Sequence, residues 1–382
     1  MELFSGAGGL GLGVSRAGFK SLLVADWDRD SCETIRENQR RGVAHVKAWP
    51  LREIDVRTLD YADISEGVDL LAGGPPCQPF SICGKHRAHR DERDMFPEVV
   101  RAVRTLRPRA VLIENVRGLV RPKFGRYFSH ILLQLTYPEI TRREGEDWPD
   151  HLARLARYHT RGRRDGLWYR VVHRVLNSSD YGVPQQRQRV VIVAFRADLG
   201  VEWSFPPPTH SREALVRDLW VTREYWERHR IARRRQPEPS VASRSVIKYV
   251  QASLFDSGKA WRTVRDAIAD LPPPREYSGA IENHRFMPGA RPYPGHTGSP
   301  LDWPAKTLKA GDHGVPGGEN MVVMDDGSVR YFTVREAARL QTFPDDYIFP
   351  VSWTESMRQI GNAVPVTLGQ TVASEIQRRL ST

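Results

Sequence analysis

Cysteine is scarce in this chain, and its scarcity limits the roles that a thiol can take. Of 382 residues only Cys32, Cys77 and Cys83 are cysteine. Three cysteines cannot build a disulfide framework, and no pair of Cys-x-x-Cys elements is present to hold a structural zinc ion. We therefore expect no metal site, which leaves chemical reactivity as the special role open to one of these thiols.

Long apolar runs are missing as well. No stretch approaches the roughly 20 residues that a membrane-spanning helix requires. Met1 is followed by an acidic residue and a glycine cluster rather than by a basic and then apolar leader. We expect a protein that remains in the cytoplasm and does not contact a membrane.

Acidic residues are outnumbered by basic ones. The 46 Asp and Glu stand against 57 Lys and Arg, a formal net charge of +11. This sign favours a polyanionic partner, nucleic acid first, although an arginine excess also arises as compositional drift in a GC-rich genome. The basic stretch 228–235 is by itself typical of a solvated helix face or a linker. The 40% hydrophobic content is ample for a buried core, which excludes disorder throughout.

The first 200 residues or so alternate apolar runs with amphipathic stretches. The runs, rich in Leu and β-branched residues, are 21–25, 68–72, 110–114, 171–176 and 190–195. Strands that alternate with helices predict a mainly parallel sheet covered on both faces, a three-layer α/β fold. The densely charged segment 142–166 looks like an insertion between elements of this sheet.

The texture of the chain changes after residue 200. Residues 205–327 are rich in Pro and Gly, which break regular elements into short pieces and predict a smaller, loop-rich domain. Helical periodicity returns after Arg330, where Thr333 and Glu336 have the spacing of a capping box. A final amphipathic helix is predicted at roughly 366–380. We divide the chain into domains at 1–200 and 201–350, and a segment at 351–382 that returns to the first domain.

A glycine-rich segment follows the predicted first strand. Residues 3–13 read LFSGAGGLGLG, a strand that runs into a glycine turn and then a helix, so that backbone can approach a ligand closely. The spacing G-x-G-x-x-G passes through Gly6, Gly8 and Gly11, so a dinucleotide-binding dehydrogenase must be considered. No Gly-Lys-Ser or Gly-Lys-Thr is present, which argues against a P-loop NTPase.

Carboxylates follow the next two elements. Run 21–25 ends in Asp26 and Trp27, and Asp55 follows the element after it. A carboxylate at the end of a strand can accept both ribose hydroxyls of an adenosine group, and a neighbouring indole can pack on adenine. Asp55 could accept from an adenine amino group. The alternative is that Asp26 and Asp55 are N-caps of helices.

A proline-rich loop presents a cysteine at the predicted edge of the sheet. Residues 73–81 read GGPPCQPFS and follow run 68–72 directly, so Cys77 lies where open α/β sheets place their chemistry. A nucleophilic thiol needs help from a cation, a helix terminus or a base, and the alternative is a small buried side chain. Glu114 closes run 110–114, where partial desolvation lets a carboxyl group hold or share a proton. Arg187 and Arg189 alternate with Gln188, so both are expected on one side of an extended segment.

These motifs, in this order along the chain, resemble those of the cytosine-5 DNA methyltransferase family. The matching blocks are 3–13, 73–81, 114–116 (ENV), 185–190 (QQRQRV), 333–343 (TVREAARLQTF) and 361–366 (GNAVPV). They span the whole chain, and Pro-Pro-Cys-Gln-Pro followed by Glu-Asn-Val is highly specific, whereas the glycine loop alone is not. The family usually has several residues before its first block and an Asp where this chain has Glu2.

The resemblance implies the Rossmann-like fold of S-adenosylmethionine-dependent methyltransferases. It also implies S-adenosylmethionine as methyl donor, S-adenosylhomocysteine as product, and a role for each matching residue. Cys77 would be the nucleophile, Glu114 would engage the cytosine ring, and Arg189 would hold its O2 atom with support from Arg187. The donor would be bound by Phe4, Gly6, Gly8, Gly9, Leu10, Asp26, Trp27, Asp55, Pro75, Asn362 and Val364.

The resemblance also implies double-stranded DNA as partner and a bacterial restriction-modification setting. Residues 82–96 would form a loop over flipped DNA, with Gln78, Ser81, Lys85, Arg87 and Arg93 in contact with it. Domain 1–200 would be catalytic and domain 201–350 would read the target, where His284, Arg285, Arg291, Lys309 and His313 are candidate readers or, equally, phosphate contacts or loop residues. We expect a monomer at the nucleoid, alongside a cognate restriction endonuclease.

Two other functions compete with this one. A tRNA cytosine methyltransferase would use the same chemistry, but such relatives carry Cys-Phe-Thr before the late helix, where this chain has Tyr331-Phe332-Thr333. A catalytically silent DNA-binding protein on the same scaffold has no reason to retain Cys77, Glu114 and Arg189 together. DNA methylation is therefore favoured.

Overall fold

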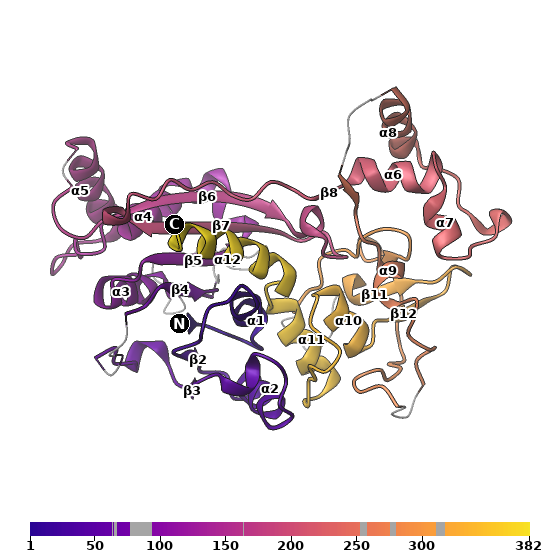
Figure 1. Ribbon diagram of the computed structural model, residues 1–382, viewed down its shortest axis with the longest axis horizontal. Helices are drawn as coiled ribbons and strands as arrows, with labels where there is room; N and C mark the ends of the chain where they lie inside the picture. Colours follow the sequence, from indigo (N-terminus) through magenta and orange to yellow (C-terminus); the bar gives the residue numbers. More distant parts are fainter. Residues whose placement is uncertain are drawn as a thin grey trace. The chain divides into compact units, whose positions relative to one another are not determined.

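The chain folds into two compact units. The computed structural model describes residues 1–62, 64, 67–76, 94–162, 164–252, 258–275, 280–310 and 318–382. Unit 1 comprises Met1–Leu176, Gln188–Pro206 and Gly369–Thr382, and unit 2 comprises Asn177–Arg187 and Pro207–Leu368. The chain therefore leaves one unit for the other and returns more than once, as its colours show in Figure 1.

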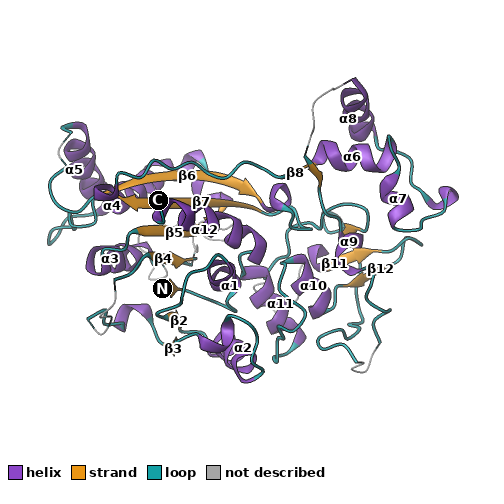
Figure 2. Ribbon diagram, in the orientation of Figure 1, coloured by secondary structure: helices purple, strands orange, loops and turns teal. Residues whose placement is uncertain are grey.

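A seven-stranded sheet forms the centre of unit 1 (Figure 2). In spatial order its strands are β3 (Leu51–Glu53), β2 (Val24–Asp26), β1 (Glu2–Leu3), β4 (Leu70–Gly73), β5 (Ala110–Val116), β7 (Gln188–Arg196) and β6 (Tyr169–Asn177). Neighbours from β3 to β5 pair in parallel, whereas β5 and β7 are antiparallel. The predicted mainly parallel sheet is confirmed, and the predicted apolar runs overlap its strands.

Helices cover both faces of this sheet. They are α1 (Gly9–Arg16), α2 (Arg29–Arg40), α3 (Phe96–Leu106), α4 (Gly125–Thr136), α5 (Trp148–Thr160) and α12 (Val366–Leu380), the last with the predicted bounds. Alternate strand residues such as Leu71 and Val111 join one buried cluster with Val99 of α3 and Ile131 of α4. Their neighbours along the strands, such as Leu112, point to the opposite face, because side chains alternate along a strand. No residue of α1, α2 or α12 belongs to this cluster.

The charged segment 142–166 contains α5, which is held to α4 by two buried histidines. His130 Nε2 lies 3.0 Å from His151 Nδ1, and His151 Nε2 donates to the carbonyl oxygen of Ile140 at 2.8 Å. That donation leaves His151 Nδ1 as the acceptor for His130. Burial lowers the pKa of both imidazoles, that of His130 to about 4, so both rings are neutral near pH 7.

Unit 2 is built from short elements. Its helices are α6 (Arg212–Trp220), α7 (Glu224–Arg228), α8 (Val241–Ala252), α9 (Val264–Ile268), α10 (Val334–Leu340) and α11 (Trp353–Asn362). Strands β10 (Ser299–Pro300), β11 (Met321–Val323) and β12 (Val329–Tyr331) form one small sheet, and β8 (His210–Ser211) pairs with β9 (Lys259–Ala260). The capping box predicted at Thr333 and Glu336 is confirmed at the start of α10.

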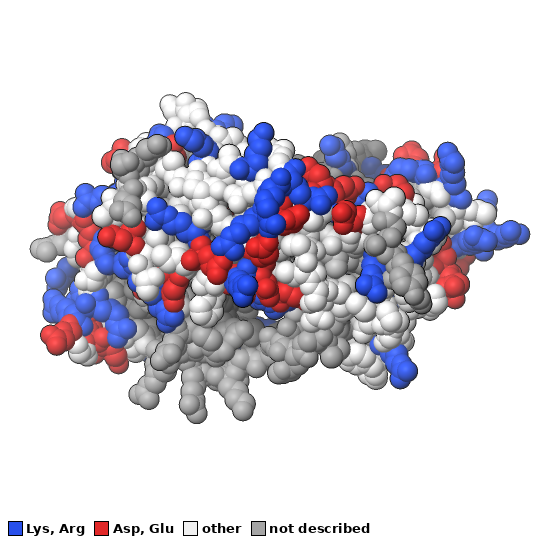
Figure 3. Space-filling view, turned by 90° about the horizontal axis from the view of Figure 1, so that it is seen from below, with Lys and Arg blue, Asp and Glu red and all other residues white. Residues whose placement is uncertain are grey.

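Charged side chains of both signs share the surface. In the middle of the face shown in Figure 3, basic side chains lie next to acidic ones rather than in an unbroken basic patch. Among the residues that the structure describes, no helix is both long and apolar enough to cross a lipid bilayer.

Candidate functional site

The glycine-rich segment connects β1 to α1 through a tight backbone turn. Phe4, Gly6 and Gly8 all have positive φ angles, of 57°, 52° and 78°. This region is open to glycine and disfavoured for a residue with a side chain, so Phe4 is a strained position. Gly11, in the first turn of α1, has no room for a side chain, because a Cβ atom there would overlap the carboxyl group of Glu2.

Asp26 holds the start of this segment. Its Oδ2 accepts from the Gly6 amide at 2.7 Å, and its Oδ1 accepts from the Asp28 amide at 2.9 Å. Burial raises the pKa of this carboxyl, and the backbone donors oppose that rise. The alternative that Asp26 caps a helix is wrong: Asp28 caps α2 by accepting from the Ser31 amide. Trp27 follows with 71% of its surface exposed, so its indole face is open to a ligand.

Asp55 does cap a helical turn, as the alternative for it proposed. Its Oδ1 accepts from the Arg57 amide at 2.9 Å at the start of the 3-10 turn Val56–Thr58. Arg57 Nη2 lies 2.5 Å from Asp55 Oδ2, and this guanidinium lowers the pKa of the carboxyl. Contact of Asp55 with a donor molecule stays a prediction.

The segment that leads to Cys77 is tied to the neighbouring strands. A Cβ on Gly73 would lie 2.8 Å from the carbonyl oxygen of Leu3, so only glycine fits there. Asn115 Nδ2 donates to the carbonyl oxygen of Pro75 at 3.0 Å. Because Asn115 follows Glu114, this bond fixes the end of β4 beside the end of β5. Residues Cys77, Gln78, Ser81, Lys85, Arg87 and Arg93 lie outside the described residues.

Glu114 and Arg189 form an ion pair at the ends of β5 and β7. Arg189 Nε lies 2.9 Å from Glu114 Oε1, and the side chains are 13% and 10% exposed. Val116 is directly opposite Arg189 in the antiparallel register, so Arg189 is the diagonal neighbour of Glu114 on the same face. The pair is close but not aligned as a hydrogen bond, and Glu114 Oε1 accepts none from the described residues.

Arg187 has a different environment from the one predicted. Strand β7 begins at Gln188, so the expected strand alternation does not include Arg187. The side chain is 1% exposed, and its guanidinium donates to the carbonyl oxygens of Leu308 and Gly361, at 3.3 Å and 2.8 Å. Arg187 thus joins separate stretches of unit 2.

The last predicted donor residues also lie in unit 2. Asn362 is the exposed final residue of α11, and Val364 follows at 7% exposure. The preceding residue, Gly361, packs against backbone, because a Cβ there would lie 2.5 Å from the amide nitrogen of Ala310.

Sequence reasoning assigned no role to two residues that shape the site. Glu2 stood out only as a departure from the family's Asp, and its contact with Gly11 depends on how β1 packs under α1. Asn115 is part of the Glu-Asn-Val block. Its place directly after Glu114 was the one sequence signal that its amide could hold the segment that leads to Cys77, where it donates to Pro75.

The fold is that of a methyltransferase. The chain matches, over its full length, a crystal structure of a putative DNA modification methyltransferase encoded within an Escherichia coli prophage, with a TM-score of 0.58, 21% identity and 99% of that chain covered. It also matches the Dnmt2 methyltransferase of S. pombe, with a TM-score of 0.56, 18% identity and 100% and 98% of the two chains covered.

The chain belongs to the C-5 cytosine-specific DNA methylase family, whose model matches residues 1–137 and 163–378. It is 31% identical to the type II methyltransferase M.PspPI of Psychrobacter sp. over 100% of this chain and 79% of that protein. It is 29% identical to M.NgoMIV of Neisseria gonorrhoeae, over 100% and 97% of the two chains. It is therefore a cytosine-5 DNA methyltransferase, of a family that generally depends on S-adenosylmethionine. The unmatched residues 138–162 overlap the segment predicted to be an insertion.

Proposed function

We propose that this chain transfers a methyl group from S-adenosylmethionine to C5 of a cytosine flipped out of a specific site in duplex DNA. The step would pass through a covalent bond between the sulfur of Cys77 and C6 of the ring. The ion pair of Glu114 with Arg189, beside the loop that leads to Cys77, is the observation that carries the proposal.

The electronic problem explains why these residue types are needed. C5 of cytosine is too electron-poor to take a methyl group from a sulfonium ion. Addition of the Cys77 thiolate at C6 moves electron density onto C5, and a proton or hydrogen bond at N3 from Glu114 eases that addition. Arg189 stabilises negative charge that develops at O2. After the transfer a base removes the C5 proton, and the thiolate is expelled as the C5–C6 double bond reforms.

The geometry of the ion pair suits this task. Glu114 and Arg189 neutralise each other, and Glu114 Oε1 accepts no hydrogen bond from the described residues, so this oxygen can engage a ring that offers N3 and an exocyclic amine beside O2. We assign Arg187 a supporting role in this site. Its bonds to the carbonyl oxygens of Leu308 and Gly361 mean that the support would act through the backbone. The base must leave the stack first, which costs a few kcal/mol.

Features of the glycine-rich segment fit a nucleoside-containing methyl donor. The backbone from Phe4 to Gly9 makes a tight turn with three positive φ angles, Asp26 offers a carboxylate to ribose hydroxyls, and Trp27 offers an exposed ring to adenine. The donor, when bound, supplies the activated methyl group. Further residues proposed to hold it are Leu10, Asp55, Pro75, Asn362 and Val364.

We further propose that residues 201–350 read the DNA sequence and that Gln78, Ser81, Lys85, Arg87 and Arg93 contact the DNA near the flipped base. The enzyme would act as a monomer on DNA of the nucleoid, alongside a cognate restriction endonuclease. The type II names of the relatives support this setting.

The proposal is tested with duplex oligonucleotides that carry 5-fluorocytosine. Fluorine cannot leave as a cation, so once C5 has been methylated the thiolate cannot be eliminated and the bond between Cys77 and C6 persists. A protein–DNA species stable to denaturation is therefore expected when the donor is supplied. Bisulfite sequencing of DNA from a host that expresses the chain would identify the site to be used. The absence of any trapped species on DNA containing that site would rule the mechanism out.

A further inference from the structure

Four exposed arginines cluster in one short stretch of unit 2 and have no ion pair with a described residue. We call residues 230–235 the arginine turn; it contains Arg230, Arg233, Arg234 and Arg235, all exposed. None of these has an ion pair with a residue that the structure describes. By contrast, Arg265, Arg330 and Arg339 each pair with at least one carboxylate within 2.6 Å.

The arginine turn is a fixed structure rather than a loose linker. Residues Arg233–Arg235 form a 3-10 turn. The Ile231 amide donates to the Trp226 carbonyl at 2.9 Å, and Gln236 Nε2 donates to the Ile231 carbonyl at 3.0 Å, which closes the turn on itself. Arg223 Nη1 then holds Gln236 Oε1 at 2.8 Å.

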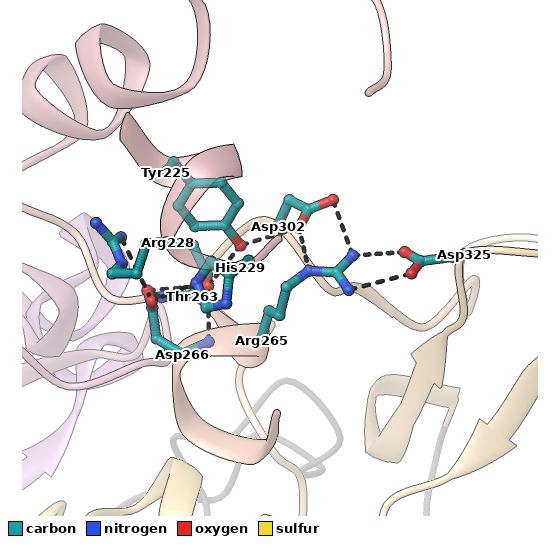
Figure 4. A network of polar contacts seen from close by, with 8 residues as sticks. All are labelled: Tyr225, Arg228, His229, Thr263, Arg265, Asp266, Asp302 and Asp325. Carbon is teal, nitrogen blue, oxygen red and sulfur yellow. Dashed lines mark hydrogen bonds and ion pairs between the residues drawn. The ribbon is translucent and has the colours of Figure 1, made fainter. Parts of the chain in front are cut away.

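The helix before the turn is anchored by the network in Figure 4. Tyr225 of α7 is fully buried, and its hydroxyl lies 2.9 Å from both Thr263 Oγ1 and Asp302 Oδ1. His229 Nε2 lies 2.8 Å from Asp266 Oδ1, which Arg228 also approaches at 3.5 Å. The network therefore pairs Arg228 with Asp266 and fixes α7, while the four arginines of the arginine turn have no ion pair with a carboxylate of the described residues.

The next helix continues the basic character. Arg244 and Lys248 are exposed on α8, one helical turn apart, and so lie on one face. Neither side chain has an ion pair with a described residue, although Arg244 Nε donates to the carbonyl oxygen of Pro239 at 3.4 Å. Several guanidinium groups carried on one backbone turn are suited to phosphate oxygens, because each group offers several donors in a plane.

We propose that the arginine turn binds the phosphate backbone of duplex DNA. This inference rests on the proposed function, which makes DNA the substrate, and it assigns to these residues affinity rather than choice of sequence. Phosphate contacts position a protein on DNA and carry no sequence information directly. Each arginine that neutralises a phosphate releases counterions, so its contribution appears in the salt dependence of binding.

The test compares two triple variants with the same change in net charge. One is Arg233→Gln, Arg234→Gln and Arg235→Gln, and the matched control changes Arg157, Arg161 and Arg164, exposed on or after α5 of unit 1, to Gln. Affinity for a non-cognate duplex is measured at several salt concentrations without methyl donor. The slope of log affinity against log salt is negative, and its magnitude is expected to decrease by about 2–3 for the arginine-turn variant, at about 0.9 per lost phosphate contact. It is expected to stay unchanged for the control.

Further variants separate charge from folding. Replacement of the same three arginines by Lys is expected to restore the slope, and an unchanged thermal midpoint shows that the glutamine variant is folded. Equal slopes for the two glutamine variants would overturn the proposal. The same titration is made with single-stranded RNA of equal length, and a loss of slope seen only with that RNA and not with the duplex would also overturn it. Because binding is measured without methyl transfer, this outcome is independent of the 5-fluorocytosine experiment. A chain that traps no cytosine can still show the slope change.

Discussion

The carboxyl group of Glu2 occupies the space that a side chain on Gly11 would need. Glu2 lies in β1 and Gly11 in the first turn of α1, so this contact sets how closely the strand and the helix approach around the glycine-rich segment. Burial raises the pKa of Glu2 to about 8, so the carboxyl is mostly neutral at pH 7.

This contact makes Gly11→Ala a disruptive change. The added methyl group would displace the Glu2 carboxyl, and overpacking of this kind costs about 1–3 kcal/mol of folding free energy. We expect weaker binding of S-adenosylmethionine by isothermal titration calorimetry and a lower urea midpoint. Adding Glu2→Asp, which shortens the acid, should recover part of both losses, whereas Gly125→Ala should be harmless because nothing lies within 4 Å of its Cβ position. Additive losses in the double variant would contradict the steric explanation.

Replacement of Cys77 by Ala or Ser is expected to abolish methylation. The thiolate is the proposed nucleophile, and neither side chain can replace it, while affinity for DNA and donor should remain within about tenfold because C6 attack is not part of ground-state binding. Labelled methyl groups from S-adenosylmethionine are counted on duplex DNA. Transfer by the Cys77→Ala protein would refute the assignment, and Cys32→Ala serves as the control for loss of a thiol.

Glu114→Gln is expected to slow methyl transfer by about 10²–10⁴, the range for a general acid–base group. The amide keeps the shape of the carboxyl but cannot deliver a proton to N3. It also removes the charge opposite Arg189. Single-turnover rates at saturating DNA and donor measure the chemical step alone. A rate within threefold of the unaltered enzyme would show that Glu114 is not required for protonation of the base.

Stability is expected to decrease on acidification because of His130 and His151. In the folded protein their pKa values lie below the ordinary value of 6.5, that of His130 at about 4, so below pH 6.5 the unfolded chain binds protons that the folded one does not. The free energy of unfolding should therefore fall between pH 6.5 and pH 4, by up to about 3 kcal/mol for His130.

Urea unfolding across this pH range measures the effect. His130→Gln should flatten the pH dependence, whereas replacement of the exposed His45 by Asn should leave it as it is. An undiminished pH dependence in His130→Gln would show that other groups cause it.

Local patterns in the sequence predicted the elements of the fold, and they could not predict contacts between distant residues. The apolar runs and the Thr333–Glu336 spacing identify strands and a capped helix because their signals are periodic or a few residues long. The alternative that Asp26 is an N-cap was wrong because Asp28, two residues on, occupies that position. The ion pair of Glu114 with Arg189 joins strands far apart in the chain, and the pairing of His130 with His151 depends on how α4 meets α5. No spacing rule encodes such tertiary contacts.

The way in which the chain alternates between the two units restricts how unit 2, which includes most of the proposed DNA-reading domain, could be exchanged among relatives. A chimera that transplants 207–368 alone would leave Asn177–Arg187 from the host protein, although that short stretch belongs to the same unit. The Arg187 of the host protein would then lie next to a transplanted segment whose backbone need not place carbonyl oxygens where those of Leu308 and Gly361 accept its hydrogen bonds here. Functional hybrids should therefore be recovered most often when both stretches come from the same donor protein.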